Sequence, residues 1–170
     1  GLISFVTPHS HIVMRKYRES GAEYMPIAFV FGLPPAYEIM ANFSGLHMDM
    51  WGEMEMVGTI MNRDIEMVPC ETLDLTVPAE AEIVVEGRVK LDGRTRVGDV
   101  TSPSMYHLPH YEELPEVEIT AITMRADRPI YRNHQSCPQT DHQILPRLCH
   151  EAMLYNRLTE MGLKVKDVRF

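Results

Sequence analysis

Two side chains suited to acid–base or metal chemistry, His11 and Asp99, stand where a helix is expected to begin and where a turn is expected to end. Ser10 is expected to cap a helix over residues 11–20, which places the His11 imidazole in the first turn, beside partly unpaired backbone amides. Asp99 follows Gly98 in a turn. Judged by residue type alone, these are a surface histidine and an ordinary turn aspartate, since both are common in such places.

Glu53 and Glu55 lie in a helix that is expected over residues 51–61. Side chains two positions apart on a helix point in different directions, so only one of the two can face a given site. From residue type alone, both acids are assigned to a solvated helix face.

Other candidate ligands do not form complete sets. His107 and His110 lie in a segment rich in Ser, Pro, His and Tyr, where a second metal site is conceivable but lacks a further ligand at credible spacing. A loop that lines the substrate or contacts a neighbouring domain is the favoured interpretation. The three cysteines (Cys70, Cys137 and Cys149) include no Cys-x-x-Cys pair, so they predict buried thiols in a reducing compartment.

The elements that would position these groups include a strand beginning at Ile83. Its side chains alternate between two faces, which carry Ile83, Val85, Gly87, Val89 and Leu91 on one side and Glu82, Val84, Glu86, Arg88 and Lys90 on the other. This period of two predicts a half-buried strand whose first face packs in the core and whose second face meets water or a ligand.

Apolar runs elsewhere complete an α+β pattern. Residues 25–32 predict a strand buried on both faces, and residues 116–124 predict an alternating strand. Helices are expected after Pro35 and from Pro146, because proline suits the first helical position. We therefore expect a mainly antiparallel sheet, closed into a barrel, with helices packed outside it.

Composition limits the class of protein. The 170 residues, of which 45% are hydrophobic and 24% charged, suit a single domain over residues 1–170. The net charge of -8 argues against a nucleic-acid partner, which requires a basic face. Because the sequence shows neither a membrane-length apolar run nor a signal peptide, it predicts a cytoplasmic protein without a membrane partner.

A longer motif carries a resemblance to a known family. The segment Glu71-Thr72-Leu73-Asp74-Leu75-Thr76-Val77-Pro78-Ala79, followed by Glu82-Ile83-Val84-Val85-Glu86-Gly87, resembles the signature of the UbiD family. These enzymes are reversible decarboxylases of aromatic and α,β-unsaturated acids that use prenylated FMN. The resemblance implies a split β-barrel of the flavin-reductase type. It covers the whole chain but only the middle of a family member, so we interpret the chain as the central, cofactor-binding domain, excised or processed from a longer one.

The resemblance also implies a metal site that bridges to the flavin phosphate. His11, in Ser10-His11-Ile12, matches the family's metal-binding histidine, with His9 as its rival. Glu53 stands four residues before Val57-Gly58 and so matches the metal-binding glutamate. The implied ions are Mn2+ or Mg2+, with K+ nearby.

Asn42 and Ser44 lie in the segment that matches a loop passing beside the flavin in family members, and this loop is two residues longer here. The residues implied to contact the cofactor are therefore Ser10, His11, Asn42, Ser44 and Glu53.

The implied catalytic acid is Asp99. The family turn Glu-Gly-Pro-Phe/Tyr-Gly-Glu/Asp matches residues 94–99, so Asp99 corresponds to the second acid, whereas Arg94 replaces the first. A carboxylic acid held near a flavin and away from water has a raised pKa and can deliver a proton to the carbon that loses CO2. Either Arg94 points away from the site, or this subgroup uses a different acid.

The function implied by the resemblance is that of the central domain of a prenylated-FMN-dependent carboxy-lyase acting on an aromatic or unsaturated acid. The third metal ligand and the catalytic arginine belong to the arm that precedes this region in the family, so the isolated chain is expected to be inactive. The expected partners are the acid substrate, the missing N- and C-terminal parts of its own chain, and further copies in a homo-oligomer. Two alternatives stay open: a non-catalytic flavin-binding subunit, favoured by Arg94, and a plain FMN-binding reductase domain, for which no glycine-rich fingerprint is present.

Overall fold

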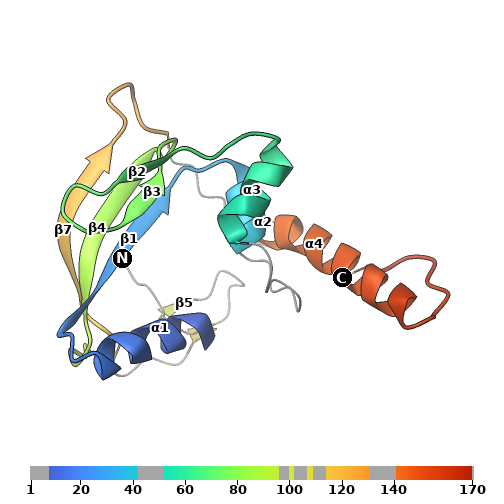
Figure 1. Ribbon diagram of the computed structural model, residues 1–170, viewed down its shortest axis with the longest axis horizontal. Coiled ribbons are helices and arrows are strands. Elements are labelled where there is room, and N and C mark those ends of the chain that lie inside the picture. Colours follow the sequence, from blue (N-terminus) through green and yellow to red (C-terminus); the bar gives the residue numbers. More distant parts are fainter. Residues whose placement is uncertain are drawn as a thin grey trace. The chain divides into compact units, whose positions relative to one another are not determined.

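The computed structural model describes residues 8–41, 52–95, 100–101, 107–108, 114–130 and 141–169 (Figure 1). The chain divides into two compact units. Unit 1 consists of Gly1–Gly32 and Met67–Tyr131, and unit 2 consists of Leu33–Glu66 and Arg132–Phe170. The described strands and the first helix belong to unit 1, and the other described helices belong to unit 2.

The centre of unit 1 is a three-stranded antiparallel sheet in which β4 (Ile83–Lys90) lies between β1 (Tyr24–Phe31) and β7 (Val117–Met124) (Figure 1). Two short antiparallel ladders accompany it. They pair β2 (Met67–Pro69) with β3 (Thr76–Pro78), and β5 (Val100–Thr101) with β6 (His107–Leu108). The α+β class with antiparallel sheets is thus confirmed, whereas the described strands form separate sheets and no closed barrel.

Burial along β4 corrects the prediction that one face is solvated. Val84 and Glu86, on the face assigned to water or ligand, are buried, and so is Val89 on the opposite face. The side that is covered therefore changes along the strand. The pairing with β7 shifts at the same point: Glu86 pairs with Ala121 and Gly87 with Ile119, so the residue between those two in β7, Thr120, is a bulge.

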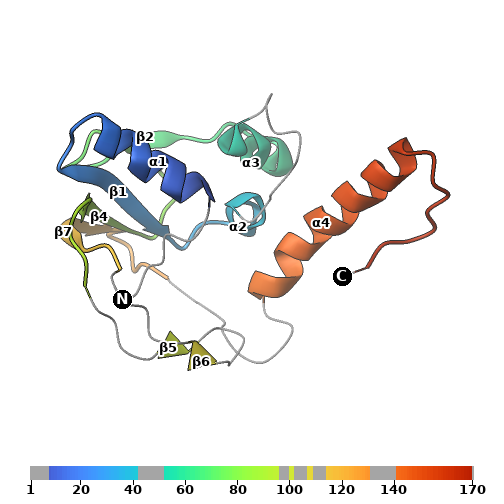
Figure 2. The same ribbon diagram turned by 90° about the horizontal axis from the view of Figure 1, so that it is seen from below.

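The core on one side of the sheet is formed with α1 (Pro8–Glu19), which lies alongside β1 (Figure 2). Met14 of this helix packs with Met25, Val89 and Leu91. The helix begins at Pro8, so the prediction that Ser10 is its N-cap is wrong; a proline at the first helical position is favourable because that position needs no N–H donor.

The prediction that residues 25–32 form a strand buried on both faces is correct for the strand but wrong for its burial. Only Met25 of β1 is fully buried, and the other residues are half-buried. In the described sheet β1 pairs on one side only, with β4. Pro26 lacks a backbone N–H group. It is tolerated in β1 because a strand that pairs on one side only leaves some of its N–H groups without a partner strand.

Unit 2 contains α2 (Pro35–Ala41), α3 (Glu53–Met61) and α4 (Asp141–Glu160). Its core is formed by Ala36, Tyr37 and Met40 of α2 with Val57 of α3. The helix α4 continues through Pro146 and does not start there, contrary to the prediction. Within the described parts of the chain, no helix combines the length and apolar character needed to cross a bilayer.

Candidate functional site

The predicted metal ligand His11 is the fourth residue of α1 and lies at the end of its first turn, although this helix begins earlier than the sequence indicates. Its side chain is exposed and has no hydrogen-bond partner among the described residues. Ser10, the residue before it, is half-buried and has an interaction partner. An exposed imidazole without a protein partner is chemically able to bind a metal ion. The structure describes no side chain for His9, the rival ligand, although His9 lies in the same helix.

Glu53 and Glu55 lie in the first turn of α3, where they have different environments. The carboxylate of Glu55 accepts a hydrogen bond of 3.0 Å from the backbone N–H of Gly52, the N-cap residue. Glu53, the first residue of the helix, is exposed and has no such bond in the described part of the chain. Glu55 is therefore engaged in stabilising the helix, and Glu53 is the acid of this turn that is available to a ligand.

The other predicted site residues, Asn42, Ser44 and Asp99, lie outside the described residues. Of the two predicted metal ligands, His11 belongs to unit 1 and Glu53 to unit 2. Their convergence on one cation remains a prediction. Within the described ranges, no group of three His, Cys, Asp or Glu side chains is arranged to hold a metal ion.

Arg94, which replaces an acid of the family motif, binds the backbone of its own turn. Its guanidinium donates hydrogen bonds to the carbonyl oxygens of Leu91 (3.2 Å) and Gly93 (2.9 Å). The next residue, Thr95, pairs with Leu114 through two backbone hydrogen bonds of 2.8 and 3.0 Å. Arg94 therefore has a structural role in this turn.

The centre of the signature segment is a buried carboxylate on the face of β4 that was predicted to meet water or a ligand. Glu86, only 1% exposed, accepts hydrogen bonds from the backbone N–H groups of Glu71 (2.8 Å) and Thr72 (2.7 Å). It also accepts a bond of 2.6 Å from the Thr72 hydroxyl, which in turn contacts the hydroxyl of the bulge residue Thr120 at 2.6 Å. The two ends of the signature, Glu71-Thr72 and Glu86-Gly87, are thus joined in space.

The charge of Glu86 is maintained by these donors. Burial by itself raises the pKa of the carboxyl group, but the hydrogen bonds from the Thr72 hydroxyl and from the Glu71 and Thr72 amides outweigh it, and the pKa lies below its ordinary value. Nearby, burial and then the negative charge of Glu86 raise the pKa of the Cys70 thiol, so Cys70 is a neutral thiol at neutral pH.

Beside the bulge, the backbone of β7 approaches β4 so closely that position 87 requires glycine. A Cβ atom at this position would lie 2.7 Å from the carbonyl oxygen of Glu118 in β7, closer than real Cβ contacts allow. The Glu-Gly pair of the signature therefore combines a buried carboxylate with a close backbone approach. The sequence signal for this role was the glycine inside an otherwise regular strand pattern.

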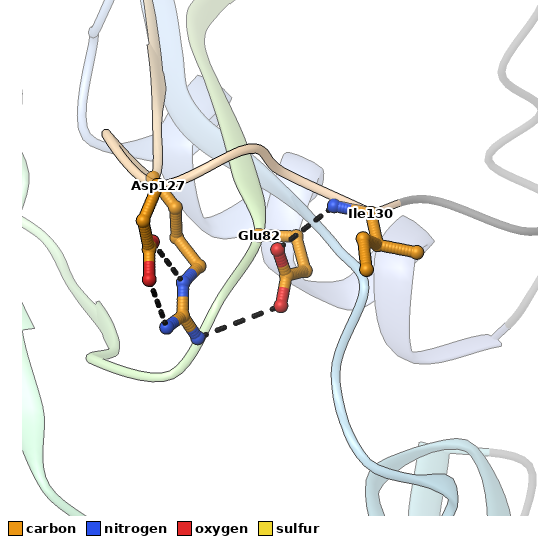
Figure 3. A network of polar contacts seen from close by, with 4 residues as sticks. Glu82, Asp127 and Ile130 are labelled. Carbon is orange, nitrogen blue, oxygen red and sulfur yellow. Dashed lines mark hydrogen bonds and ion pairs between the residues drawn. The ribbon is translucent and has the colours of Figure 1, made fainter.

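A second glutamate of the signature, Glu82, lies in an exposed polar network (Figure 3). Its carboxylate accepts a hydrogen bond of 2.9 Å from the backbone N–H of Ile130 and forms an ion pair of 3.5 Å with Arg125. Arg125 also binds Asp127, at 3.1 Å between Nε and Oδ1. Glu82 and Glu86 border a pocket of about 220 Å3 in unit 1.

Comparison with known proteins identifies the family. The fold is a mixed α+β architecture with antiparallel sheets that matches UbiD-class enzymes. The family model described as "UbiD: 3-octaprenyl-4-hydroxybenzoate carboxy-lyase Rift-related domain" matches residues 2–137. The chain therefore belongs to the UbiD family.

Individual relatives support this assignment. An anhydromevalonate phosphate decarboxylase of Methanothermobacter thermautotrophicus is 29% identical over 98% of this chain and 38% of its own length. Ferulic acid decarboxylase 1 of Candida dubliniensis is 32% identical over 71% of this chain and 24% of its own length. An evolved dimeric form of the UbiD-class enzyme HmfF from Pelotomaculum thermopropionicum, solved in complex with prFMN, matches with a TM-score of 0.83 and 28% identity over 99% of this chain and 38% of HmfF. The chain thus spans less than two fifths of the length of these relatives.

Proposed function

We propose that this chain is the central cofactor-binding domain of a prenylated-FMN-dependent enzyme that reversibly decarboxylates an aromatic or α,β-unsaturated carboxylic acid. The observation that carries the proposal is the fold match over 99% of the chain to HmfF, a protein solved in complex with prFMN. Two further relatives are decarboxylases, which agrees with the reaction class. A split barrel is part of the proposal.

Two described side chains have the donor chemistry that this function would require. Prenylated FMN, when bound, would supply the electron sink for loss of CO2. Its phosphate would need a hard divalent cation, for which Mn2+ or Mg2+ suits a mixed nitrogen and oxygen donor set, with K+ nearby. His11 and Glu53 are an exposed imidazole and an exposed carboxylate, and neither is engaged by another described residue. We assign the cation to these two side chains, and the neighbouring cofactor contacts to Ser10, Asn42 and Ser44.

Asp99 is assigned the proton transfer. Loss of CO2 breaks the bond between the carboxylate and the adjacent carbon and leaves an electron pair that must be protonated. A neutral carboxylic acid close to this carbon can donate that proton, and the resulting C–H bond completes the reaction. Arg94 does not compete for this role, because its guanidinium is bonded to the carbonyls of Leu91 and Gly93.

The full-length protein tests this function directly. We expect protein reconstituted with prenylated FMN, Mn2+ and K+ to release CO2 from at least one acid in a panel of aromatic and unsaturated acids. In the Asp99→Asn variant we expect the rate to fall by at least about 100-fold while flavin and Mn2+ remain bound, because only the proton donor is removed. Full activity of the variant would exclude Asp99 as the acid.

A non-catalytic flavin-binding subunit is the second candidate, because Arg94 replaces one acid of the family motif. This candidate predicts retention of flavin without CO2 release or exchange from any acid in the panel. The same reconstitution therefore distinguishes the two. We also propose that the enzyme is cytoplasmic and homo-oligomeric.

A further inference from the structure

Two of the segments that connect the units leave unit 1 beside the same residue. One leaves at Gly32, directly after β1, and the other leaves at Tyr131. The backbone N–H of Glu82 donates a hydrogen bond of 3.0 Å to the carbonyl of Phe31, at the end of β1. The Glu82 carboxylate accepts a bond of 2.9 Å from the N–H of Ile130, one residue before the second exit (Figure 3). Glu82 thus binds both segments.

The two segments are in close contact at this point. Gly32 has a φ of +75°, and a Cβ atom on it would lie 2.3 Å from Cγ of Glu82 and 3.0 Å from the carbonyl oxygen of Ile130. A side chain at position 32 would displace Glu82, so the contact requires glycine for its space as well as for its backbone conformation.

Arg125 fixes the carboxylate of Glu82 from the other side. Its guanidinium lies 3.5 Å from Glu82, while Asp127 holds the same guanidinium at 3.1 Å (Figure 3). The backbone N–H of Arg125 also donates to the carbonyl of Glu82 at 3.0 Å. The Glu82 side chain is only 19% exposed in this arrangement, so both oxygens are held in a defined direction.

We infer that Glu82 is a positioning residue that clamps the two exits of unit 1 to each other and thereby limits the movement of the segment that follows Gly32. That segment continues into α2 and α3 and carries Glu53. The effect of the clamp on cofactor binding rests on the proposed function, since Glu53 is there a ligand of the cation. The clamp itself rests only on the contacts of Glu82.

Hydrogen exchange of the full chain tests the clamp. In Glu82→Ala we expect the Ile130 amide to exchange at least about tenfold faster, as for the loss of one charge-assisted hydrogen bond, with faster exchange also in peptides around Gly32. Glu82→Gln, which keeps one acceptor oxygen, should show a smaller change at the same sites. The control Glu118→Gln removes an exposed carboxylate of β7 and should leave both sites unchanged. Unchanged exchange at Ile130 in Glu82→Ala, or an equal increase throughout both units, would overturn the clamp.

A Mn2+ titration of the full-length protein with FMN, read from the EPR signal of free Mn2+, tests the positioning role. We expect Glu82→Gln to bind Mn2+ several-fold more weakly than the wild type, although it removes no metal ligand, and Glu118→Gln to bind normally. Faster exchange at Ile130 together with unaltered Mn2+ affinity would refute the positioning role. A wild type that binds no Mn2+ with FMN would instead refute the proposed function, while the exchange result at Ile130 would stand.

Discussion

At the scale of single residues, Glu86 shows how a motif of an enzyme family can be structural. The carboxylate is buried and accepts bonds from Glu71 and Thr72, so the two parts of the signature hold one another in place. Alternation along the strand identified the position of Glu86 but not its environment. The covering segment is distant in sequence, and period-two patterning contains no information about which loop folds over which face.

Replacement of Glu86 should destabilise unit 1. In Glu86→Gln, one carboxylate oxygen becomes an NH2 group facing a backbone donor, and we expect a loss of roughly 2–3 kcal/mol in the free energy of unfolding at neutral pH. Urea denaturation measures this loss. Glu118→Gln, an exposed acid on the paired strand, should cost less than about 0.5 kcal/mol. A similar small loss for both variants would contradict the structural role of Glu86.

The same network predicts a pH dependence. Because the pKa of Glu86 is lower in the folded than in the unfolded chain, its stabilising contribution is complete above the unfolded-state pKa. The contribution decreases as the pH falls below that value and is lost as the pH passes through the lowered folded-state pKa. Urea midpoints measured at decreasing pH should therefore fall more steeply for the wild type than for Glu86→Gln.

At the scale of elements, the existence of a helix or strand was easier to predict than its first and last residues or the face that it exposes. Apolar patterning located β1, β4 and β7, and proline located the start of α2. The predicted start of α1 was three residues too late, because Ser10 offered a good cap while Pro8 offered an equally good first position.

The packing of α1 on the sheet should depend on one face of the helix. Met14 is 3% exposed against Met25, Val89 and Leu91, so Met14→Ala should cost roughly 2–4 kcal/mol in the free energy of unfolding. Ile12, which is 40% exposed on the same helix, provides the control, and Ile12→Ala should cost less than about 1 kcal/mol. Thermal or urea denaturation distinguishes the two, and equal losses would contradict the packing described here.

At the scale of the whole molecule, the candidate site draws on residues far apart in the chain. His11 belongs to unit 1 and Glu53 to unit 2, and no local pattern connects an imidazole on one helix to an acid on another. Only the family resemblance supplied that pairing. Residue patterns alone could separate Glu53 from Glu55, because side chains two positions apart on a helix point in different directions.

This distinction gives a matched pair of variants in the full-length protein. Glu53→Gln should weaken Mn2+ binding in the presence of FMN by more than about tenfold, because an amide is a poorer ligand for a hard cation. Glu55→Gln should leave the affinity within about twofold, because its amide oxygen can still accept the Gly52 N–H. Isothermal titration measures both affinities, and a greater loss for Glu55→Gln would reverse the assignment.

The additional residue in β7 has a consequence for how this strand tolerates change in length. Val117 and Ile119 pair with Val89 and Gly87, whereas Ala121 and Thr123 pair with Glu86 and Val84, which belong to the opposite side of β4. Odd-numbered side chains therefore switch from one side of the sheet to the other at Thr120. Deleting that single threonine would remove the bulge and leave Ile119 and Ala121 as neighbours opposite Gly87 and Glu86, so the flanking side chains would keep their sides of the sheet.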